Sequence, residues 1–162
     1  MQPYQFGGDM IKKVNFETTT FANIPQRFEA GTTNIAGVIG LGSAIEFLEQ
    51  FDKKEIAKYV KHLGRYAQAQ LMEIDGVEIV GKADQKTGIC SFLVKNAHPH
   101  DVATFLGSEQ IAVRAGHHCT QPLMEILGIP GTSRASFTIY NTEEDVNQLV
   151  RALVHVISFF NV

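Results

Sequence analysis

The spacing of apolar residues predicts both helices and strands in this chain. The most regular stretch runs from Lys53 to Ile74, where apolar residues recur at helical spacing, at Ile56, Tyr59, Val60, Leu63, Ala67 and Leu71. Asp75 and Gly76 are expected to end that helix. By contrast, apolar and polar side chains alternate along residues 134–140. A period of two residues is typical of a half-buried strand.

The same reasoning predicts an ordered series of elements from residue 77 onward. Strands are expected at 77–80, 88–94, 111–114 and 134–140, and helices after His98, at 122–127 and at 142–160. The last helix has a clear start, because Thr142 offers a capping hydroxyl and three acidic residues follow it. Four strands with helices covering one face make an α+β layer.

The first part of the chain does not fit into this layer. Residues 1–9 have no core periodicity, residues 11–20 contain short strand-like pieces, and the segment around Pro25 is expected to be extended or a loop. A turn at residues 31–34 is expected to cap a helix that begins at Ile35, and its glycines suggest close approach of another backbone. We therefore divide the chain into an arm, 1–34, and a domain, 35–162, that includes the connecting helix.

Composition narrows the class of protein. The chain has 162 residues, of which 44% are apolar and 19% charged, as in an ordinary globular domain. Its net charge of −3 and its lack of a basic run argue against nucleic-acid binding. No apolar run of about 18 residues and no leader-like start is visible, so we expect no membrane span and no secretory signal. Two cysteines make no disulfide framework, which predicts a cytoplasmic protein with free thiols.

The stretch Arg-Ala-Gly-His-His-Cys-Thr-Gln-Pro, from Arg114 onward, carries the clearest chemical signal. A cysteine attacks as its thiolate, and the free thiol has a pKa near 8.5. Imidazolium rings at His117 and His118 and the start of a following helix would favour the thiolate at Cys119. We therefore interpret Cys119 as a reactive nucleophile, whereas Cys90 lies in an apolar strand and is expected to be buried.

Two arginines on strand candidates accompany this loop. Arg114 precedes it and Arg134 opens the next strand, and a guanidinium suits a bidentate grip on a carboxylate. A zinc site built from the adjacent histidines and Cys119 is an alternative, but neighbouring side chains rarely point at one ion, so no metal is predicted. The turn at 31–34 suits either a phosphate or a plain helix cap.

Several segments, in order along the chain, resemble one family. The motif from Arg114, the run Arg-Ala-Ser-Phe-Thr-Ile-Tyr-Asn-Thr-Glu-Glu-Asp-Val from Arg134 and the segment Arg-Phe-Glu-Ala-Gly-Thr from Arg27 are similar to the C-terminal part of SUF-type (group II) cysteine desulfurases. These are pyridoxal-phosphate enzymes of the class V aminotransferase-like family. The resemblance implies the small C-terminal domain of a fold-type I enzyme, with an antiparallel sheet and an N-terminal arm left from the large cofactor domain.

The resemblance also implies an activity and roles for individual residues. These enzymes convert L-cysteine to L-alanine and hold the sulfur as a persulfide, here on Cys119, for a SUF acceptor protein and iron-sulfur cluster assembly. Arg134 would grip the substrate carboxylate, and Arg114 would be an active-site arginine beside the thiol. Thr32 would reach across a homodimer interface to the partner subunit's cofactor phosphate. At position 33 the family has proline where this chain has Thr33.

One feature of the family is expected to be missing. The family's cofactor-binding lysine lies in a Ser-x-His-Lys segment upstream of the region that residue 1 matches, and no lysine of this chain has that context. We therefore expect the 162-residue chain alone to retain no pyridoxal phosphate and to be inactive. A non-catalytic fold or docking module is the main alternative, and a zinc-binding domain is a lesser one.

Overall fold

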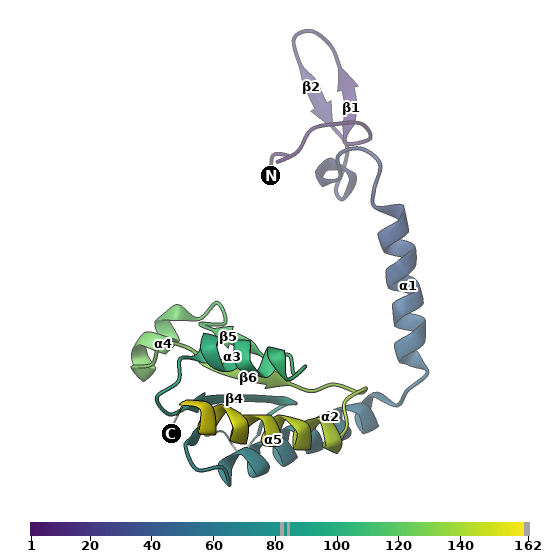
Figure 1. Cartoon of the computed structure of the whole chain (residues 1–162). Helices are drawn as coiled ribbons and strands as arrows, with labels where there is room; N and C mark the ends of the chain where they lie inside the picture. Colours follow the sequence, from purple (N-terminus) through teal and green to yellow (C-terminus); the bar gives the residue numbers. More distant parts are fainter. Residues whose placement is uncertain (82, 84, 161–162) are drawn as a thin grey trace. The chain divides into compact units, whose positions relative to one another are not determined.

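The computed structural model describes residues 1–81, 83 and 85–160. The chain forms two compact units, Met1–Phe51 and Asp52–Val162, each described here by itself (Figure 1). The division therefore falls after the helix that begins at Ile35, whereas the sequence pattern placed it at residue 34. This helix has no buried residues.

The N-terminal unit contains a hairpin and two helices. Strands β1 (Ile11–Val14) and β2 (Thr19–Phe21) pair antiparallel, as the strand-like pattern predicted. A short 3-10 helix, η1 (Gln26–Phe28), forms where extended or loop structure was expected. Helix α1 (Ile35–Glu49) begins where predicted, because the side chain of Asn34 accepts a hydrogen bond of 2.9 Å from the backbone N–H of Gly37.

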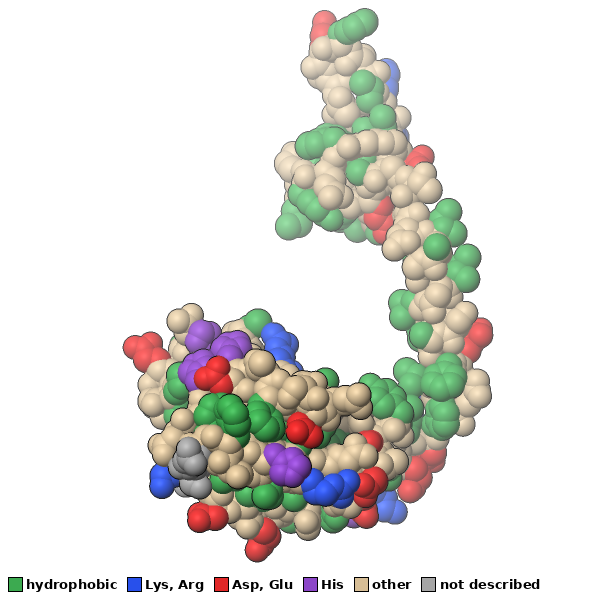
Figure 2. Space-filling model, in the orientation of Figure 1, with side chains coloured by type: hydrophobic (Ala, Val, Ile, Leu, Met, Phe, Trp, Pro, Cys, Tyr) green, Lys and Arg blue, Asp and Glu red, His purple; other side chains and the backbone are tan. Residues whose placement is uncertain are grey.

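Helix α1 is apolar along its length and exposed in this structure (Figure 2). Its large exposed apolar side chains are Ile35, Val38, Ile39, Leu41, Ile45, Phe47 and Leu48. A helix that is apolar all round is normally buried. Among the described residues nothing lies within 4 Å of a Cβ built on Gly40 or Gly42, so the close backbone approach expected there is not made within this chain.

The C-terminal unit has one four-stranded antiparallel sheet in the order β3-β4-β6-β5. Its strands are β3 (Val77–Val80), β4 (Ile89–Val94), β5 (Arg114–Gly116) and β6 (Thr132–Ser136). Its helices are α2 (Lys53–Met72), α3 (Pro99–Ser108), α4 (Gln121–Leu127) and α5 (Glu143–Phe160). The predicted α+β class with an antiparallel sheet is confirmed. The polar turn expected at 82–87 lies partly outside the described residues.

Two strand predictions were wrong in their limits. The apolar run before Arg114 is not in the sheet, because Ile111 donates to the carbonyl of Leu106 and leads out of α3. At the other strand, Phe137 makes one further bond to Gly88, and a turn closed by Thr138 and Asn141 then ends the pairing. The alternation of apolar and polar residues therefore continues beyond the point where the strand pairing ends.

The core lies between the sheet and helices α2, α3 and α5, and Figure 1 shows α2 and α5 lying side by side along the sheet. Alternate residues of β4 enter it, namely Cys90, Phe92 and Val94. From β6 the core takes Ala135, so the residues on either side of it point to the opposite face. That opposite face is where the candidate site lies. No helix among the described residues is long and apolar enough to cross a membrane.

Candidate functional site

The register of the sheet brings the two predicted arginines together. Arg114 of β5 and Arg134 of β6 are direct antiparallel partners, and Ser91 of β4 pairs with Arg134 on its other side. Directly opposed residues have their Cβ atoms only about 5 Å apart and point to the same face of a sheet. Because Ala135 enters the core, both arginines project from the face that the helices leave uncovered.

The two guanidinium groups form an unbalanced positive pair. Like charges directly opposite each other on neighbouring strands are destabilising. Within the described part of the chain, no acidic side chain lies within ion-pair distance of Arg114 or Arg134. The buried Nε of Arg134 also has no hydrogen-bond partner there. A carboxylate between the two groups would relieve the repulsion and give that Nε an acceptor.

Cys119 is exposed and lies beside this pair. Its Sγ is 4.0 Å from Nη2 of Arg114, the outer limit of a hydrogen bond to sulfur. The backbone is left-handed at two successive residues, with φ of 54° at His118 and 63° at Cys119. Such φ values cost a non-glycine residue about 1–3 kcal/mol each, and they persist where surrounding structure enforces them. The strain is therefore concentrated at the candidate nucleophile.

Local contacts hold the loop in this shape. The backbone N–H and the hydroxyl of Thr120 both donate to the carbonyl of His117, at 2.9 and 2.7 Å, and Thr120 is the residue before α4. At the base of the loop, Gly116 and Gly131 have φ of 115° and 153°. A Cβ on Gly131 would lie 2.9 Å from the carbonyl carbon of Gly116, so the two backbones meet here.

The ring of His118 is held against Thr132. Its Nε2 lies 3.1 Å from the carbonyl oxygen and 2.9 Å from the hydroxyl of Thr132. Burial lowers the pKa of His118 below its usual value, and the charges of Arg134, Arg114 and His117 lower it further, although the bond to Thr132 opposes them. The lowered pKa favours the neutral ring, and an effect of His118 on the thiol stays a prediction. His117 is exposed, and its effect on the thiol stays a prediction.

Cys90 is a structural residue, as predicted. Its side chain is only 2% exposed, in the core beneath β4. Burial raises the pKa of the Cys90 thiol to about 11, against a smaller lowering effect of the Lys86 charge. The two cysteines therefore differ in access to solvent, and Cys90 is held in its protonated form.

The comparisons with known proteins place the chain in a family. The family model described as Aminotransferase class-V matches residues 1–149. This chain belongs to the class-V aminotransferase family. The family depends on pyridoxal phosphate. The match confirms the resemblance at family level, and the structures of its relatives confirm the predicted fold-type I architecture.

Several relatives of this class-V chain are cysteine desulfurases. A probable cysteine desulfurase of Staphylococcus epidermidis is 49% identical over 99% of this chain. The cysteine desulfurase CsdA of Escherichia coli is 37% identical over 98% of this chain, with a TM-score of 0.90. The corresponding enzyme of Thermococcus onnurineus is also 37% identical, over 94%, with a TM-score of 0.84. The chain spans 39%, 39% and 38% of these proteins.

In the described site, the arginine pair suits a carboxylate, and Cys119 suits a sulfur. Lys61 donates to Gln85 and Lys86 donates to the carbonyl of Gly81, so these lysines are engaged elsewhere.

Thr32 lies in the other compact unit and is exposed. Its predicted contact with a partner subunit's cofactor phosphate stays a prediction. For the zinc alternative, the described residues contain no group of three or more histidine, cysteine or acidic side chains that could hold a metal ion.

Sequence reasoning missed the residues that support the loop from below. Thr132 is 1% exposed and bonds His118, Gly131 packs on Gly116, and the Nε2 of His100 lies 3.7 Å from a Cβ built on Gly116. None of these has a signal in the sequence, because each acts through a strand pairing or a contact across the fold. The motif from Arg114 contains the loop residues of the site but not the residues that support the loop.

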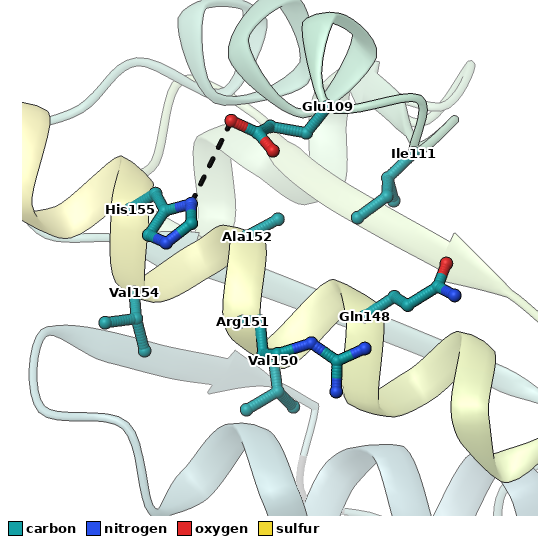
Figure 3. Close-up of a pocket in the computed structure, with 8 residues that line it drawn as sticks. All are labelled: Glu109, Ile111, Gln148, Val150, Arg151, Ala152, Val154 and His155. Atoms are coloured by element: carbon teal, nitrogen blue, oxygen red, sulfur yellow. Dashed lines mark ion pairs between the residues drawn. The ribbon is translucent and has the colours of Figure 1, made fainter.

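A second hollow, of about 430 Å³, lies beside α5 (Figure 3). Figure 3 shows Glu109 facing His155 across it, with Oε1 of Glu109 3.9 Å from Nδ1 of His155. Arg151 on its wall is already paired with Glu144. The hollow is not lined by a cysteine, so it has no nucleophile comparable to Cys119.

The raised pKa of Cys90 predicts a pH-dependent stability. The unfolded chain ionises this thiol near its ordinary value of 9.0, whereas the folded chain keeps it protonated to about 11. Its contribution to stability is therefore complete below pH 9 and is lost as the pH rises toward 11, at up to about 1.4 kcal/mol per pH unit. Urea unfolding across this range should show the slope in the wild-type chain and a shallower one in Cys90→Ala. Parallel curves for the two proteins would contradict the prediction.

Proposed function

We propose that this chain is the C-terminal part of a SUF-type cysteine desulfurase. In the full-length enzyme, sulfur from L-cysteine would be received by Cys119 as a persulfide, and L-alanine would leave. A SUF acceptor protein in the cytoplasm would then take the sulfur for iron-sulfur cluster assembly. The relatives named above support the activity, and the motif from Arg114 supports the SUF-type subgroup.

The observation that carries the proposal is the arrangement around Arg114. This residue is the direct strand partner of Arg134, and its Nη2 is 4.0 Å from Sγ of Cys119. L-Cysteine carries a carboxylate and a sulfur only a few bonds apart. An arginine pair that binds the carboxylate would therefore bring the substrate sulfur toward Cys119.

The roles of this chain's residues follow from that arrangement. Arg134 would hold the substrate carboxylate, and Arg114 would share it and face the thiol. The Cys119 thiolate would attack the substrate sulfur, so that an S–S bond forms while the substrate C–S bond breaks. The electron pair of that bond stays with the carbon, which takes up a proton to become the methyl group of alanine. Pyridoxal phosphate, when bound in full-length family members, supplies the electron sink for the carbon next to the amine.

The chain by itself is expected to be inactive. We propose that the cofactor lysine belongs to a region outside the 162 residues, and that Thr32 reaches the partner's cofactor phosphate only in a full-length homodimer. Purified chain mixed with pyridoxal phosphate and L-cysteine should therefore form no alanine above a control without protein. Sustained alanine formation by this chain would refute its predicted inactivity.

The site itself is tested by comparing two alkylating reagents. Iodoacetate carries a carboxylate and iodoacetamide does not, so the ratio of their rates at Cys119 reports on the arginine pair. A unit charge about 4 Å away is worth about 1 kcal/mol in water, so Arg134→Gln should lower the ratio by about fivefold. High salt should lower the wild-type ratio as well.

The matched control is Arg65→Gln, which removes the same charge from an exposed position on α2. It should leave the iodoacetate to iodoacetamide ratio at its wild-type value. If Arg134→Gln and Arg65→Gln give the same ratio, the arginine pair does not receive a carboxylate and the proposed function loses its main support.

A further inference from the structure

We propose that His118 is a positioning residue, whose ring ties the Cys119 loop to strand β6 through Thr132 and thereby holds the thiol beside Arg114. The inference deepens the proposed function and rests on it. It assigns to His118 a mechanical role, where the motif alone suggested an electrostatic one.

The first step is the tautomer of the ring. The carbonyl oxygen of Thr132 only accepts hydrogen bonds, and it lies 3.1 Å from Nε2 of His118. Nε2 must therefore carry the proton, and Nδ1 then has a bare lone pair. The buried Nδ1 has no partner among the described residues, which agrees with this assignment because nothing there would receive a second proton.

The second step is the fixed position of the anchor. Thr132 is 1% exposed and is the ladder partner of Gly116, the last residue of β5. The chain leaves the sheet after Gly116. Two residues later, the side chain of His118 bonds to Thr132, the strand partner of Gly116. The bond from His118 to Thr132 thus closes a small loop on a rigid base, and Cys119 follows directly.

The third step is the backbone that the bond must hold. Successive left-handed residues at His118 and Cys119 are unfavourable for side chains other than glycine and, to a lesser degree, asparagine. Without an anchor this segment would relax to an ordinary conformation. The Cys119 side chain would then leave the position where its Sγ is 4.0 Å from Arg114.

The charges around the ring favour the neutral, bonded form. Arg134 on β6, Arg114 on β5 and His117 on the loop all oppose protonation of His118. Thr132 offers an oxygen to one nitrogen only. The ring is therefore built into the site as an uncharged hydrogen-bond donor.

The test uses the reagent ratio at Cys119 in the whole 162-residue chain. In His118→Asn the backbone preference for a left-handed residue is kept, but the side chain is too short to reproduce the Nε2 bond. The iodoacetate to iodoacetamide ratio should fall by about fivefold, as far as in Arg134→Gln, because the thiol no longer lies beside the arginines. His118→Gln, whose amide nitrogen reaches about as far as Nε2, should restore most of the ratio. A loss of stability that leaves the chain folded under the assay conditions would not change the ratio.

A second measurement is independent of alkylation. Nitrogen-15 NMR of the histidine rings should find that the pKa of His118 is lower than that of an ordinary histidine and that its neutral ring is protonated at Nε2. Thr132→Val removes the hydroxyl and should shift the Nε2 signal, whereas Thr132→Ser should leave it near its wild-type position.

The outcomes separate this inference from the proposed function. A wild-type chain without iodoacetate preference would count against the proposed function. A normal wild-type preference that survives in His118→Asn would overturn the positioning role. A neutral His118 ring that carries its proton on Nδ1 would overturn that role whatever the ratio shows.

Discussion

Cys119 is expected to react with iodoacetamide at least about a hundredfold faster than Cys90 in the folded chain near neutral pH. Cys119 is exposed, whereas Cys90 is 2% exposed. In addition, the pKa of Cys90 is raised from 9.0 to about 11, which by itself lowers its thiolate population about a hundredfold relative to an ordinary thiol. Mass spectrometry of tryptic peptides after timed alkylation would give both rates in one sample.

Two controls make this measurement decisive. The variant Cys119→Ser should show only the slow reaction, and Cys90→Ala only the fast one. In a denaturant both thiols should react at similar rates, because burial then no longer distinguishes them. Equal and slow reaction of both cysteines in the folded chain would instead favour an inert fold or docking module.

Gly64→Ala is expected to lower the free energy of unfolding by about 2–3 kcal/mol, or roughly 5–10 °C in Tm. Alanine is the better helix former by about 1 kcal/mol, so propensity alone predicts the opposite sign. However, a Cβ on Gly64 would overlap the carbonyl oxygen of Thr87 and would lie 3.0 Å from Cα of Gly88. Both are backbone atoms at the start of β4, so α2 would have to move away from the sheet.

The matched control is Gly107→Ala in α3. Gly107 is exposed, and nothing lies within 4 Å of a Cβ built on it. This variant should gain a few tenths to about 1 kcal/mol from helix propensity. Thermal unfolding of both variants therefore tests whether their changes in the free energy of unfolding have opposite signs. A Gly64→Ala chain as stable as the wild type would show that α2 and β4 separate easily.

The site was predictable to the extent that its residues are consecutive in sequence. The motif from Arg114 marks Cys119, and the apolar surroundings of Cys90 mark the other cysteine as buried, which the structure confirms. The state of His118 was not predictable. Its lowered pKa depends first on burial and then on the charge of Arg134, and its hydrogen bond depends on Thr132; both residues are distant in sequence and reach the ring only through the pairing of β5 with β6.

The sequence by itself determined the α-helices and the α+β class, and it singled out Cys119 as the candidate nucleophile. These depend on local periodicity, on caps such as Asn34 and on adjacent residues of the motif, which act over a few positions. Only the tertiary structure decided where β5 and β6 begin and end, and that Arg114 faces Arg134. Strand limits and cross-strand neighbours depend on hydrogen bonds between segments far apart in the chain, and a local pattern does not contain that register.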